Sequence, residues 1–306
     1  MTDNLYVFGS VTVDMYFRGN QLTADKERFH LAIGGKYTTD EFALRIGGGG
    51  ANVAITTKRL GINTFLVAII GQNSFKDLVR SDLHRYGLSD KYLISCPDYN
   101  NISSILLSKS GERTVINFRT PHCQHLSLKN SLLNLQNAHR DWIYMGGKLP
   151  DFSINEKSLL LNQLKNKGFR ICLNLSSMEC EAGVEELGGL LANCDVLIQN
   201  KHEYSKLLKT TFENVDLKQN QLKILDHTFK GNLVITADGE GAYAYENNKV
   251  HFSQAYPPEK IIDTTGAGDA FSGAFLASLI KGDKVEHALT FASKNAGKKL
   301  ASFGAH

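Results

Sequence analysis

The sequence predicts an α/β fold with a central, mostly parallel sheet that is covered by helices on both faces. Short, continuous apolar runs of strand length alternate with amphipathic stretches of helix length, which is the pattern of a doubly covered parallel sheet. The chain has 306 residues, 42% of them hydrophobic and 21% charged, which is enough apolar sequence for a large core. This length allows one large domain with an insertion or two domains, of which we expect one domain over residues 1–306.

The expected elements of this body follow in chain order. Each strand is a short apolar run, and each helix carries its apolar residues at helical spacing. The elements are a strand over 5–11, a helix over 51–60, a strand over 64–70, a helix over 75–86, a strand over 141–145, a helix over 155–167, strands over 169–175 and 195–199, a helix from 201, strands over 233–236 and 260–262, and a helix that the segment 263–269 opens.

Two segments break this rhythm and predict a second, small antiparallel sheet. Residues 15–46 alternate in polarity without a helical pattern, and residues 99–120 contain two alternating strands around a turn at Lys109, Ser110, Gly111 and Glu112. Beside a cleft at the strand ends, such a sheet forms a lid. Pattern alone equally allows a plain surface hairpin.

The charge pattern argues against nucleic acid and membranes as partners. The net charge is +3, and the densest basic cluster, Lys294, Lys298 and Lys299, has the spacing of a solvated helix face. No apolar run is long enough to span a membrane, and the amino terminus lacks the features of a signal peptide. The five cysteines form no CxxC pair and no zinc or disulfide pattern, which predicts a reducing, cytoplasmic location.

The most informative segment is Asp263-Thr-Thr-Gly-Ala-Gly-Asp269, which opens an amphipathic helix. Gly266, Ala267 and Gly268 have little or no side chain, so their backbone N–H groups can approach an anion at a helix N-terminus. Asp269 follows in the first turn, where a carboxylate can take a proton from an attacking hydroxyl. A bare GxGD string would more readily indicate a helix cap and a tight turn, but the full string favours chemistry.

Two further segments suit a polar ligand with hydroxyl groups. Gly47 to Gly50 precede a helix whose first turn contains Asn52, and an amide side chain both donates to and accepts from a hydroxyl. Asp14 follows the first strand, at the edge of the sheet where ligands bind in open α/β folds. Each segment alone is more typical of a loop, and neither is a Walker A motif.

A fourth segment, Asn200-Lys-His-Glu203, follows the strand over 195–199 directly. Glu203 would lie in the first helical turn, where its carboxylate can order Mg²⁺ through water. The same spacing also describes a capping box with Asn200 as the cap, and locally that interpretation is the better one.

Together and in this order, the four segments resemble the ribokinase-like, or PfkB, family of carbohydrate kinases. The family's DTxGAGD signature is matched at every fixed position by residues 263–269, and its glycine-rich signature by residues 47–52. The early aspartate and the NxxE pair match as well, and the resemblance covers essentially the whole chain. It implies a three-layer α/β/α body with a small β-sheet lid, formed by about residues 15–46 and 99–120.

The resemblance also implies an ATP-dependent kinase that phosphorylates a hydroxyl of a sugar or a sugar derivative. Asp269 is then the general base that deprotonates the acceptor. Gly266, Ala267 and Gly268 stabilise the charge on the transferring phosphoryl group. A lid of this kind also allows a homodimer that forms through the exposed lid edge.

The binding residues follow from the same resemblance. The acceptor is held by Asp14, Gly48 and Asn52. Asn200 and Glu203 order Mg²⁺ and phosphate, with Glu203 acting through water. Thr236 and Gly241 lie near the nucleotide, and the backbone oxygens of Asp263 and Thr265 offer a site for a monovalent cation such as K⁺, as in many relatives.

Several positions depart from the pattern of the family. Asp238 stands where the nucleotide turn usually has a glycine, which places a negative charge near the expected nucleotide site. Thr12 replaces an asparagine of the ribokinases, and Gly146-Gly147 replaces their acidic residue, so ribose is not favoured. Residues 173–176 lack the Asp and Arg of many fructokinases and keto-deoxygluconate kinases.

Two alternatives stay open at this stage. A nucleoside kinase of the same fold would need a larger, more apolar acceptor pocket, for which Phe42 and Phe118 are candidate lining residues. A catalytically silent regulatory protein would be expected to have lost the base or the anion-binding turn, and both are intact.

Overall fold

The computed structural model describes residues 3–25, 28–109, 112–120, 125–136, 140–147, 152–225, 228–302 and 304. In this part of the chain the main sheet has the strand order β15-β14-β13-β12-β11-β10-β1-β6-β7. The seven strands β13, β12, β11, β10, β1, β6 and β7 run parallel to one another. Strands β14 and β15 are antiparallel additions at one edge. The bounds are β1 (Asn4–Phe8), β6 (Asn63–Gly71), β7 (Leu93–Cys96), β10 (Trp142–Gly146), β11 (Arg170–Asn174), β12 (Val196–Asn200), β13 (Asn232–Thr236), β14 (Ala242–Glu246) and β15 (Lys249–Ser253).

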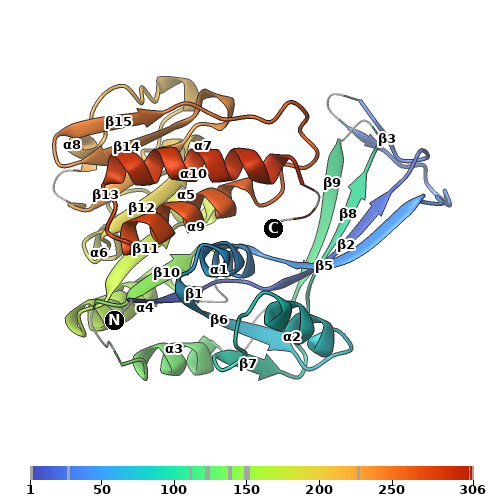
Figure 1. Ribbon diagram of the computed structural model, residues 1–306, viewed down its shortest axis with the longest axis horizontal. Helices are drawn as coiled ribbons and strands as arrows, with labels where there is room; N and C mark the ends of the chain where they lie inside the picture. The colour runs from blue at the N-terminus through green and yellow to red at the C-terminus, as the bar shows by residue number, and fades with distance from the viewer. Residues whose placement is uncertain are drawn as a thin grey trace.

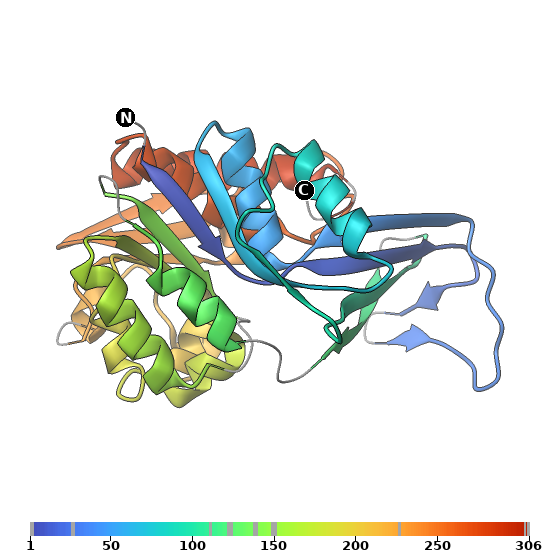
Figure 2. The same ribbon diagram turned by 90° about the horizontal axis from the view of Figure 1, so that it is seen from below.

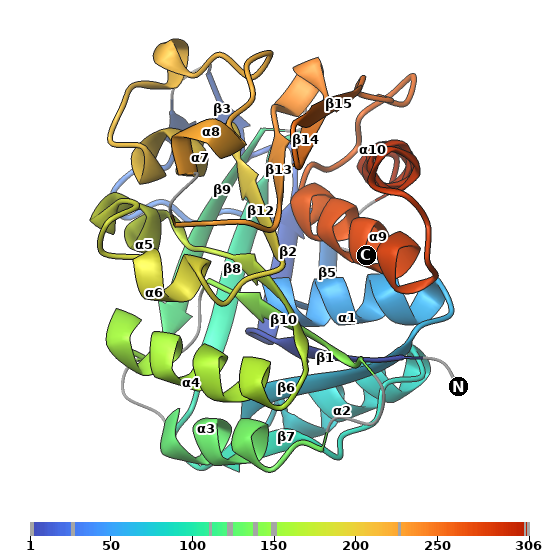
Figure 3. The same ribbon diagram turned by 90° about the vertical axis from the view of Figure 1, so that its left-hand side faces the viewer.

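Helices cover both faces of this sheet, which gives the predicted three-layer α/β/α body (Figure 3). One face carries α1 (Gly49–Arg59), α2 (Lys76–Arg85), α9 (Ala267–Ile280) and α10 (Val285–Leu300). The other carries α3 (His125–Leu133), α4 (Ile154–Asn166), α5 (Ser177–Ala182), α6 (Gly188–Leu191), α7 (Lys201–Leu207) and α8 (Leu222–Leu225).

The strands are apolar throughout because alternate side chains enter two separate cores. In β1, Leu5 and Val7 belong to the core under α1 and α9, whereas Tyr6 and Phe8 belong to the core under α4. A strand buried on both faces cannot alternate in polarity, so its sequence reads as a continuous apolar run.

A second sheet projects from the body at one end of the molecule (Figures 1 and 2). Its order is β5 (Glu41–Gly47), β2 (Thr12–Arg18), β8 (Asn101–Leu107) and β9 (Arg113–Arg119), and a small hairpin of β3 (Thr23–Ala24) and β4 (Phe29–His30) lies nearby. The β2–β5 and β8–β9 pairs are antiparallel, but the central β2–β8 pair is parallel. The prediction of a purely antiparallel sheet is therefore wrong at that pair. The turn predicted at 109–112 lies partly outside the described residues.

The two faces of the second sheet differ in burial. The inner face carries Tyr16 and Ile105, which are buried. On the opposite, outer face, Phe42 is 60% exposed, Ile116 is 60% exposed and Phe118 is 59% exposed. The register of the strands places these three side chains on the face away from Asp14. Side chains alternate between the faces of a strand, so Phe17 and Asp14, which are three positions apart on β2, point to opposite faces. Phe42 is paired with Phe17, and Phe118 is paired with Ile102, which lies on the same face as Phe17.

Four sequence predictions are wrong in detail. Residues 260–262 form no strand; instead the N–H of Ile262 donates to the carbonyl of Leu300 at the end of α10. The first strand ends at Phe8 rather than at residue 11. Lys299, predicted on a solvated face, is only 7% exposed. Cys96 is disulfide-bonded, whereas Cys172, Cys180 and Cys194 are free and buried.

Within the described residues, no helix combines the length and the apolar character that a membrane crossing requires.

Candidate active site

The start of α9 is an open helix N-terminus without a side-chain cap. Gly266 is the N-cap residue, with a φ of 77°, and its carbonyl accepts the first helical hydrogen bond from Ala270 N–H at 2.8 Å. A positive φ favours glycine at this position. A Cβ built at Gly268 would meet no atom of the described residues within 4 Å, so this part of the chain leaves the space beside the helix start open there. The N–H of Ala267 makes only a long contact, 3.4 Å, with the carbonyl of Thr264, and an anion at the helix start can replace it.

Asp269 lies in this first turn and contacts the glycine-rich segment of α1. Asn52 donates from Nδ2 to Asp269 Oδ2 at 2.7 Å, although the two residues are 217 positions apart. A Cβ added at Gly49 would lie 3.4 Å from Asp269 Oδ1. Helices α1 and α9 pack closely because Gly273 leaves room for Thr56, which lies 2.9 Å from the place of a Cβ. The structure therefore brings the two signatures into direct contact.

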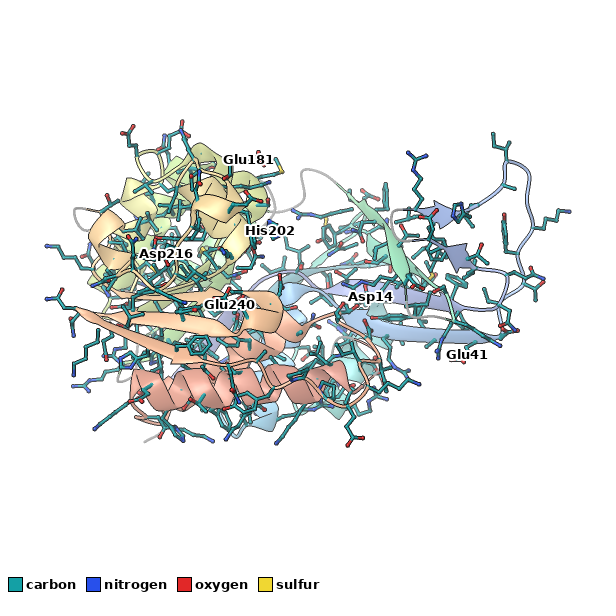
Figure 4. All side chains as sticks on the ribbon, turned by 90° about the horizontal axis from the view of Figure 1, so that it is seen from above. Asp14, Glu41, Glu181, His202, Asp216 and Glu240 are labelled. Carbon is teal, nitrogen blue, oxygen red and sulfur yellow. The ribbon has the colours of Figure 1, made fainter. Side chains whose placement is uncertain are left out.

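Asp14 is buried against the same glycine-rich segment, at the junction of the second sheet with the body (Figure 4). A Cβ at Gly47 would lie 1.9 Å from Asp14 Oδ2, so only glycine leaves room for this carboxylate. Gly48 has a φ of 90° and packs against the carbonyl of Ser10. Burial raises the pKa of Asp14 to about 6, with a smaller upward contribution from the charge of Asp263 and an opposing hydrogen bond from Ser103.

Asn200 and Glu203 form the capping box that the spacing allows. Glu203 N–H donates to Asn200 Oδ1 at 2.8 Å, and Asn200 N–H donates to Glu203 Oε2 at 3.3 Å. The box fixes the Glu203 carboxylate at the carboxyl end of β12. Burial raises the pKa of Tyr144 well above its usual range, and the charges of Asp269 and Glu203 add to this rise. The carboxylates of Asp269 and Glu203 therefore both raise the pKa of the same buried hydroxyl, that of Tyr144 on β10.

Thr236 lies beside Asn200, since these residues are partners in the β12–β13 pair. The chain then turns through a short 3-10 helix over Asp238–Glu240 and returns at Gly241, whose φ is 124°. Ala237 N–H donates to the carbonyl of Gly241 at 2.8 Å, which closes the turn. Asp238 has a φ of 46°, a left-handed conformation that glycine adopts without strain.

Asp263 and Thr265, whose backbone oxygens were predicted to hold a monovalent cation, contact Arg113 through their side chains. Arg113 extends from β9 of the second sheet, and its Nη1 donates to Asp263 Oδ1 at 3.1 Å and to the hydroxyl of Thr265. Sequence reasoning missed Arg113, because no local pattern indicates which residue of a distant hairpin reaches the signature.

The residues at the ends of the strands are compatible with the predicted Mg²⁺ ion. Among the described residues, no group of three or more His, Cys, Asp or Glu side chains is placed to hold a metal ion. Mg²⁺ needs no such group, because it keeps several waters and binds one or two carboxylates together with substrate phosphates. Glu203 supplies one carboxylate at the open strand edge. The ion pair of Arg113 with the Asp263 carboxylate involves the side chain and leaves the prediction of a K⁺ site on backbone oxygens untested.

The predicted residues therefore converge on the carboxyl edge of the parallel strands. Asp14, Gly48, Asn52 and Asp269 form one group of contacts, and the second group lies at the ends of β12 and β13. The hollow lined by Trp142, Arg170 and Asp195 holds none of them and lies at the amino ends of the strands.

Known proteins with similar sequences and structures are carbohydrate kinases. A profile of the pfkB family of carbohydrate kinases matches residues 3–306. An ATP-dependent 6-phosphofructokinase of Thermoanaerobacterium thermosaccharolyticum is 28% identical over 283 residues, covering 89% of this chain and 84% of that protein. A ribokinase of Bacillus subtilis is 24% identical over 99% of this chain and 94% of its own length. The structure of Arabidopsis thaliana ribokinase complexed with ribose and ATP superposes with a TM-score of 0.78 at 22% identity, covering 100% of this chain and 95% of that chain. The chain therefore belongs to the pfkB family of carbohydrate kinases, which are phosphotransferases with an alcohol group as acceptor.

Proposed function

We propose that this protein transfers the γ-phosphoryl group of ATP to a hydroxyl of a sugar or a sugar derivative, with Asp269 as the general base. The observation that carries the proposal is the contact between Asn52 and Asp269 at 2.7 Å, directly beside an unfilled helix start. A base and an anion-binding helix start in one place are the two parts that hydroxyl phosphorylation needs.

The chemistry assigned to each part follows from its position. Asp269 takes the proton of the acceptor hydroxyl as that oxygen attacks the γ-phosphorus. The backbone N–H groups of Gly266, Ala267 and Gly268 stabilise the negative charge of the transferring group. Asn52 donates to Asp269 Oδ2 and so fixes the orientation of this carboxylate.

The nucleotide is proposed to lie over the ends of β12 and β13. Thr236 and Gly241 border the nucleotide, and Asn200 contacts phosphate. When bound, Mg²⁺ neutralises phosphate charge in such a site. Glu203 would hold one of its waters, because the capping box keeps this carboxylate at the strand end.

The acceptor is proposed to bind Asp14, Gly48 and Asn52 on the inner side of the second sheet. A buried carboxylate binds hydroxyl groups strongly, since hydrogen bonds to a charged acceptor are stronger than neutral ones. The acidic residue of the ribokinases is absent, since Gly146-Gly147 stands in its place. No side chain fits at Gly147, because a Cβ there would lie 2.0 Å from the backbone nitrogen of Ser176. Ribose is therefore not the favoured acceptor.

The structure gives the nucleoside alternative no specific support. Phe42 and Phe118, the proposed lining residues, lie on the outer face of the second sheet rather than on the Asp14 side. The decisive experiment is a screen of ATP consumption against sugars, sugar phosphates and nucleosides. Turnover with sugars or their phosphates supports the proposal, turnover with nucleosides alone replaces it, and no turnover with any acceptor favours a regulatory protein. We also propose a cytoplasmic location, which is supported by the proposed use of ATP and not by the cysteines, because Cys96 is disulfide-bonded.

Replacing Asp238 by glycine is expected to improve nucleotide binding. Glycine relieves the left-handed backbone at a φ of 46°, which stabilises the fold by about 1 kcal/mol. Removing the negative charge lowers the KM for ATP by about threefold to tenfold, the effect of roughly 1 kcal/mol of repulsion between exposed charges. Initial rates against ATP concentration and urea unfolding measure the two effects.

Asp238→Asn separates charge from backbone strain in this test. Asparagine removes the charge but keeps a Cβ, so it is expected to lower the KM for ATP without the gain in stability. An unchanged KM in both variants would show that the nucleotide does not lie near this turn.

We further propose that the second sheet, with its segments at about residues 15–46 and 99–120, is a lid over the acceptor and a dimer surface. The inner face carries Asp14, and the outer face exposes Phe42, Ile116 and Phe118. Exposed apolar groups of this size on one sheet indicate a surface that a partner covers. The partner proposed is the lid of a second copy.

Phe118→Asp is expected to convert the dimer to a monomer. A central aromatic side chain at an interface contributes about 2 kcal/mol or more, so its loss weakens dimerisation at least roughly 30-fold. Light scattering over a range of protein concentrations measures the mass. Phe252→Asp is the matched control, because Phe252 is 52% exposed on β15 of the main sheet. A wild-type protein that is monomeric at every concentration contradicts the proposal.

A further inference from the structure

One row of residues across the inner face of the second sheet is polar from edge to edge. Asp14 on β2 is paired with Arg45 on β5. On its other side Asp14 is paired with Ser103 on β8, which is paired with Asn117 on β9. Directly paired residues share a face of the sheet, so these four side chains lie on the face that carries Asp14. The outer face exposes large apolar side chains instead. A polar inner face indicates contact with a polar molecule rather than with a protein core.

Arg45 is the charged member of this row that lacks a partner of opposite charge within the described residues. It is exposed, and its Nη1 donates to the carbonyl of the neighbouring Leu44 at 3.2 Å. In the part of the chain that the structure describes, no nitrogen of Arg45 lies within 4.0 Å of a carboxylate oxygen, and this includes the carboxylate of Asp14. Burial raises the pKa of Tyr16, and the positive charges of Arg113 and Arg45 oppose this rise, so the charge of Arg45 acts on the inner face.

Two other arginines on the same face each have a carboxylate partner. Arg18 lies 3.5 Å from Glu41, farther out on the sheet than Asp14, and Arg113 lies 3.1 Å from Asp263 (Figure 4). Arg45 differs from both, although it is the nearest of the three to Asp14 in the register. A guanidinium presents its N–H donors as a planar fork that matches the oxygens of a phosphate or a carboxylate group. Arg45 therefore offers this fork to an anion that is not part of the described chain.

Arg45 lies at one end of the proposed acceptor site, and the proposed base lies at the other end. Along β5, Arg45 is two residues before Gly47, which packs against Asp14, and two residues of strand span roughly 7 Å. Gly49 follows at the start of α1, where a Cβ would lie 3.4 Å from Asp269 Oδ1. A ligand that bridges the two ends carries its anionic group away from the hydroxyl that reacts.

We propose that the acceptor is an anionic sugar derivative, a sugar phosphate or a sugar acid, whose charged group binds Arg45 while its hydroxyls bind Asp14. Both anionic groups accept the same paired hydrogen bonds from a guanidinium. Arg45 is then a specificity-determining residue, because it contacts a part of the acceptor that does not react.

This inference deepens the proposed function and rests on it for the chemical step. The remote hydroxyl oxygen forms a bond to the γ-phosphorus of ATP, and the bond between that phosphorus and the β-phosphate oxygen breaks. ADP leaves, and the hydroxyl proton passes to Asp269. The anionic group on Arg45 takes no part in these bond changes, so it affects which acceptor binds rather than how it reacts.

The first test compares neutral sugars with their anionic derivatives as acceptors. Fructose is compared with its 1-phosphate and 6-phosphate, ribose with its 5-phosphate, and glucose with its 6-phosphate and with gluconate. For the best acceptor, kcat/KM is expected to exceed that of the neutral parent by about 10-fold to 100-fold, the contribution of one hydrogen bond to a charged group. Preference for a phosphate or for gluconate identifies the anionic group. Neutral sugars that are used as well as their derivatives overturn the inference and leave the kinase assignment in place.

The second test uses Arg45→Gln, with Arg18→Gln as the matched control. Arg18 lies on the same face, but it is already paired with Glu41. In Arg45→Gln, the KM for the anionic acceptor is expected to rise about 10-fold to 100-fold, while kcat and the use of the neutral parent change little. Arg18→Gln is expected to behave as the wild type does. Equal losses with charged and neutral acceptors, or a raised KM for ATP alone, overturn the assigned role.

The third test is a binding measurement that needs no turnover. Fructose 6-phosphate, ribose 5-phosphate, glucose 6-phosphate and gluconate are titrated calorimetrically into the wild-type protein and both variants without ATP. At least one compound is expected to bind the wild type and Arg18→Gln about 10-fold to 100-fold more tightly than Arg45→Gln. Equal melting temperatures of the ligand-free proteins show that the exposed substitutions leave the fold intact.

The binding result also separates this inference from the proposed function. Selective binding without phosphoryl transfer supports the anion site at Arg45 and contradicts the kinase assignment. Binding that is equally strong in the wild type and Arg45→Gln, or no binding of any of the four compounds, overturns the anion site, whatever the kinase assays show.

Discussion

Asp269→Asn is expected to lower kcat by about 10²–10⁴-fold, the usual contribution of a positioned general base. The asparagine amide is nearly the same shape as the carboxylate, and its oxygen can still accept the hydrogen bond that Asn52 donates at 2.7 Å. The fold and the helix start therefore stay intact while the base is lost. Coupled detection of ADP, with the best acceptor from the screen, measures kcat and both KM values.

The KM values decide how this result is interpreted. A base that acts only in the transition state lowers kcat and leaves both KM values close to those of the wild type. Asp283→Asn is a suitable control, because Asp283 bonds Ser278 at the far end of α9 and takes no part in the site. Activity of Asp269→Asn within about tenfold of the wild type would remove Asp269 as the base.

Asp14→Asn is expected to weaken acceptor use and, at the same time, to stabilise the ligand-free protein. Each hydrogen bond to a charged group contributes about 1.5–3 kcal/mol, so kcat/KM for the acceptor falls by about 10-fold to 100-fold. The same replacement is expected to raise the stability of the ligand-free protein. The wild-type carboxylate is buried and charged at neutral pH, which is unfavourable, whereas asparagine is neutral.

The pH dependence of the Asp14 effect follows from the sign of the shift. The folded protein binds this proton more tightly than the unfolded chain, since its pKa is raised from 3.8 to about 6. The contribution of Asp14 to wild-type stability therefore falls as the pH rises from about 4 to about 6, by an amount on the order of 3 kcal/mol. Asp14→Asn should gain this stability at pH 7.5 and show no gain near pH 4.

Urea unfolding at these two pH values measures the effect, and Asp283→Asn again provides the comparison. Hydrogen bonding from Ser278 lowers the pKa of Asp283, so its replacement should destabilise the protein at pH 7.5 rather than stabilise it. A wild-type protein that becomes more stable between pH 4 and pH 6, relative to Asp14→Asn, would contradict the assigned burial of a charged Asp14.

The body could be predicted because its signals are local. Strands that are buried on both faces read as apolar runs, as in β1, where Leu5 and Tyr6 enter opposite cores. The signature at 263–269 places glycines and a carboxylate at one helix start by their spacing alone. The family resemblance assigned Asn52 and Asp269 to one site, but their hydrogen bond was not predicted, because no rule of spacing joins residues so far apart.

The features that could not be predicted all depend on what covers a residue. Lys299 has the spacing of a solvated face, yet the segment around Ser302 and Gly304 buries it. The strand expected at 260–262 lacks a partner strand, and Ile262 bonds to the end of α10 instead. Arg113 follows an ordinary hairpin pattern, and only the position of that hairpin directs it to Asp263.

The separation of Asn52 from Asp269 by 217 positions has a consequence for the order in which the molecule folds. Closing so long a stretch of chain is slow and brings no reward until both ends are in place. Helix α4 and its neighbouring strands can form early from local contacts, but the reactive centre cannot. On renaturation from denaturant, enzymatic competence is therefore the last property to return, well after helical content has recovered.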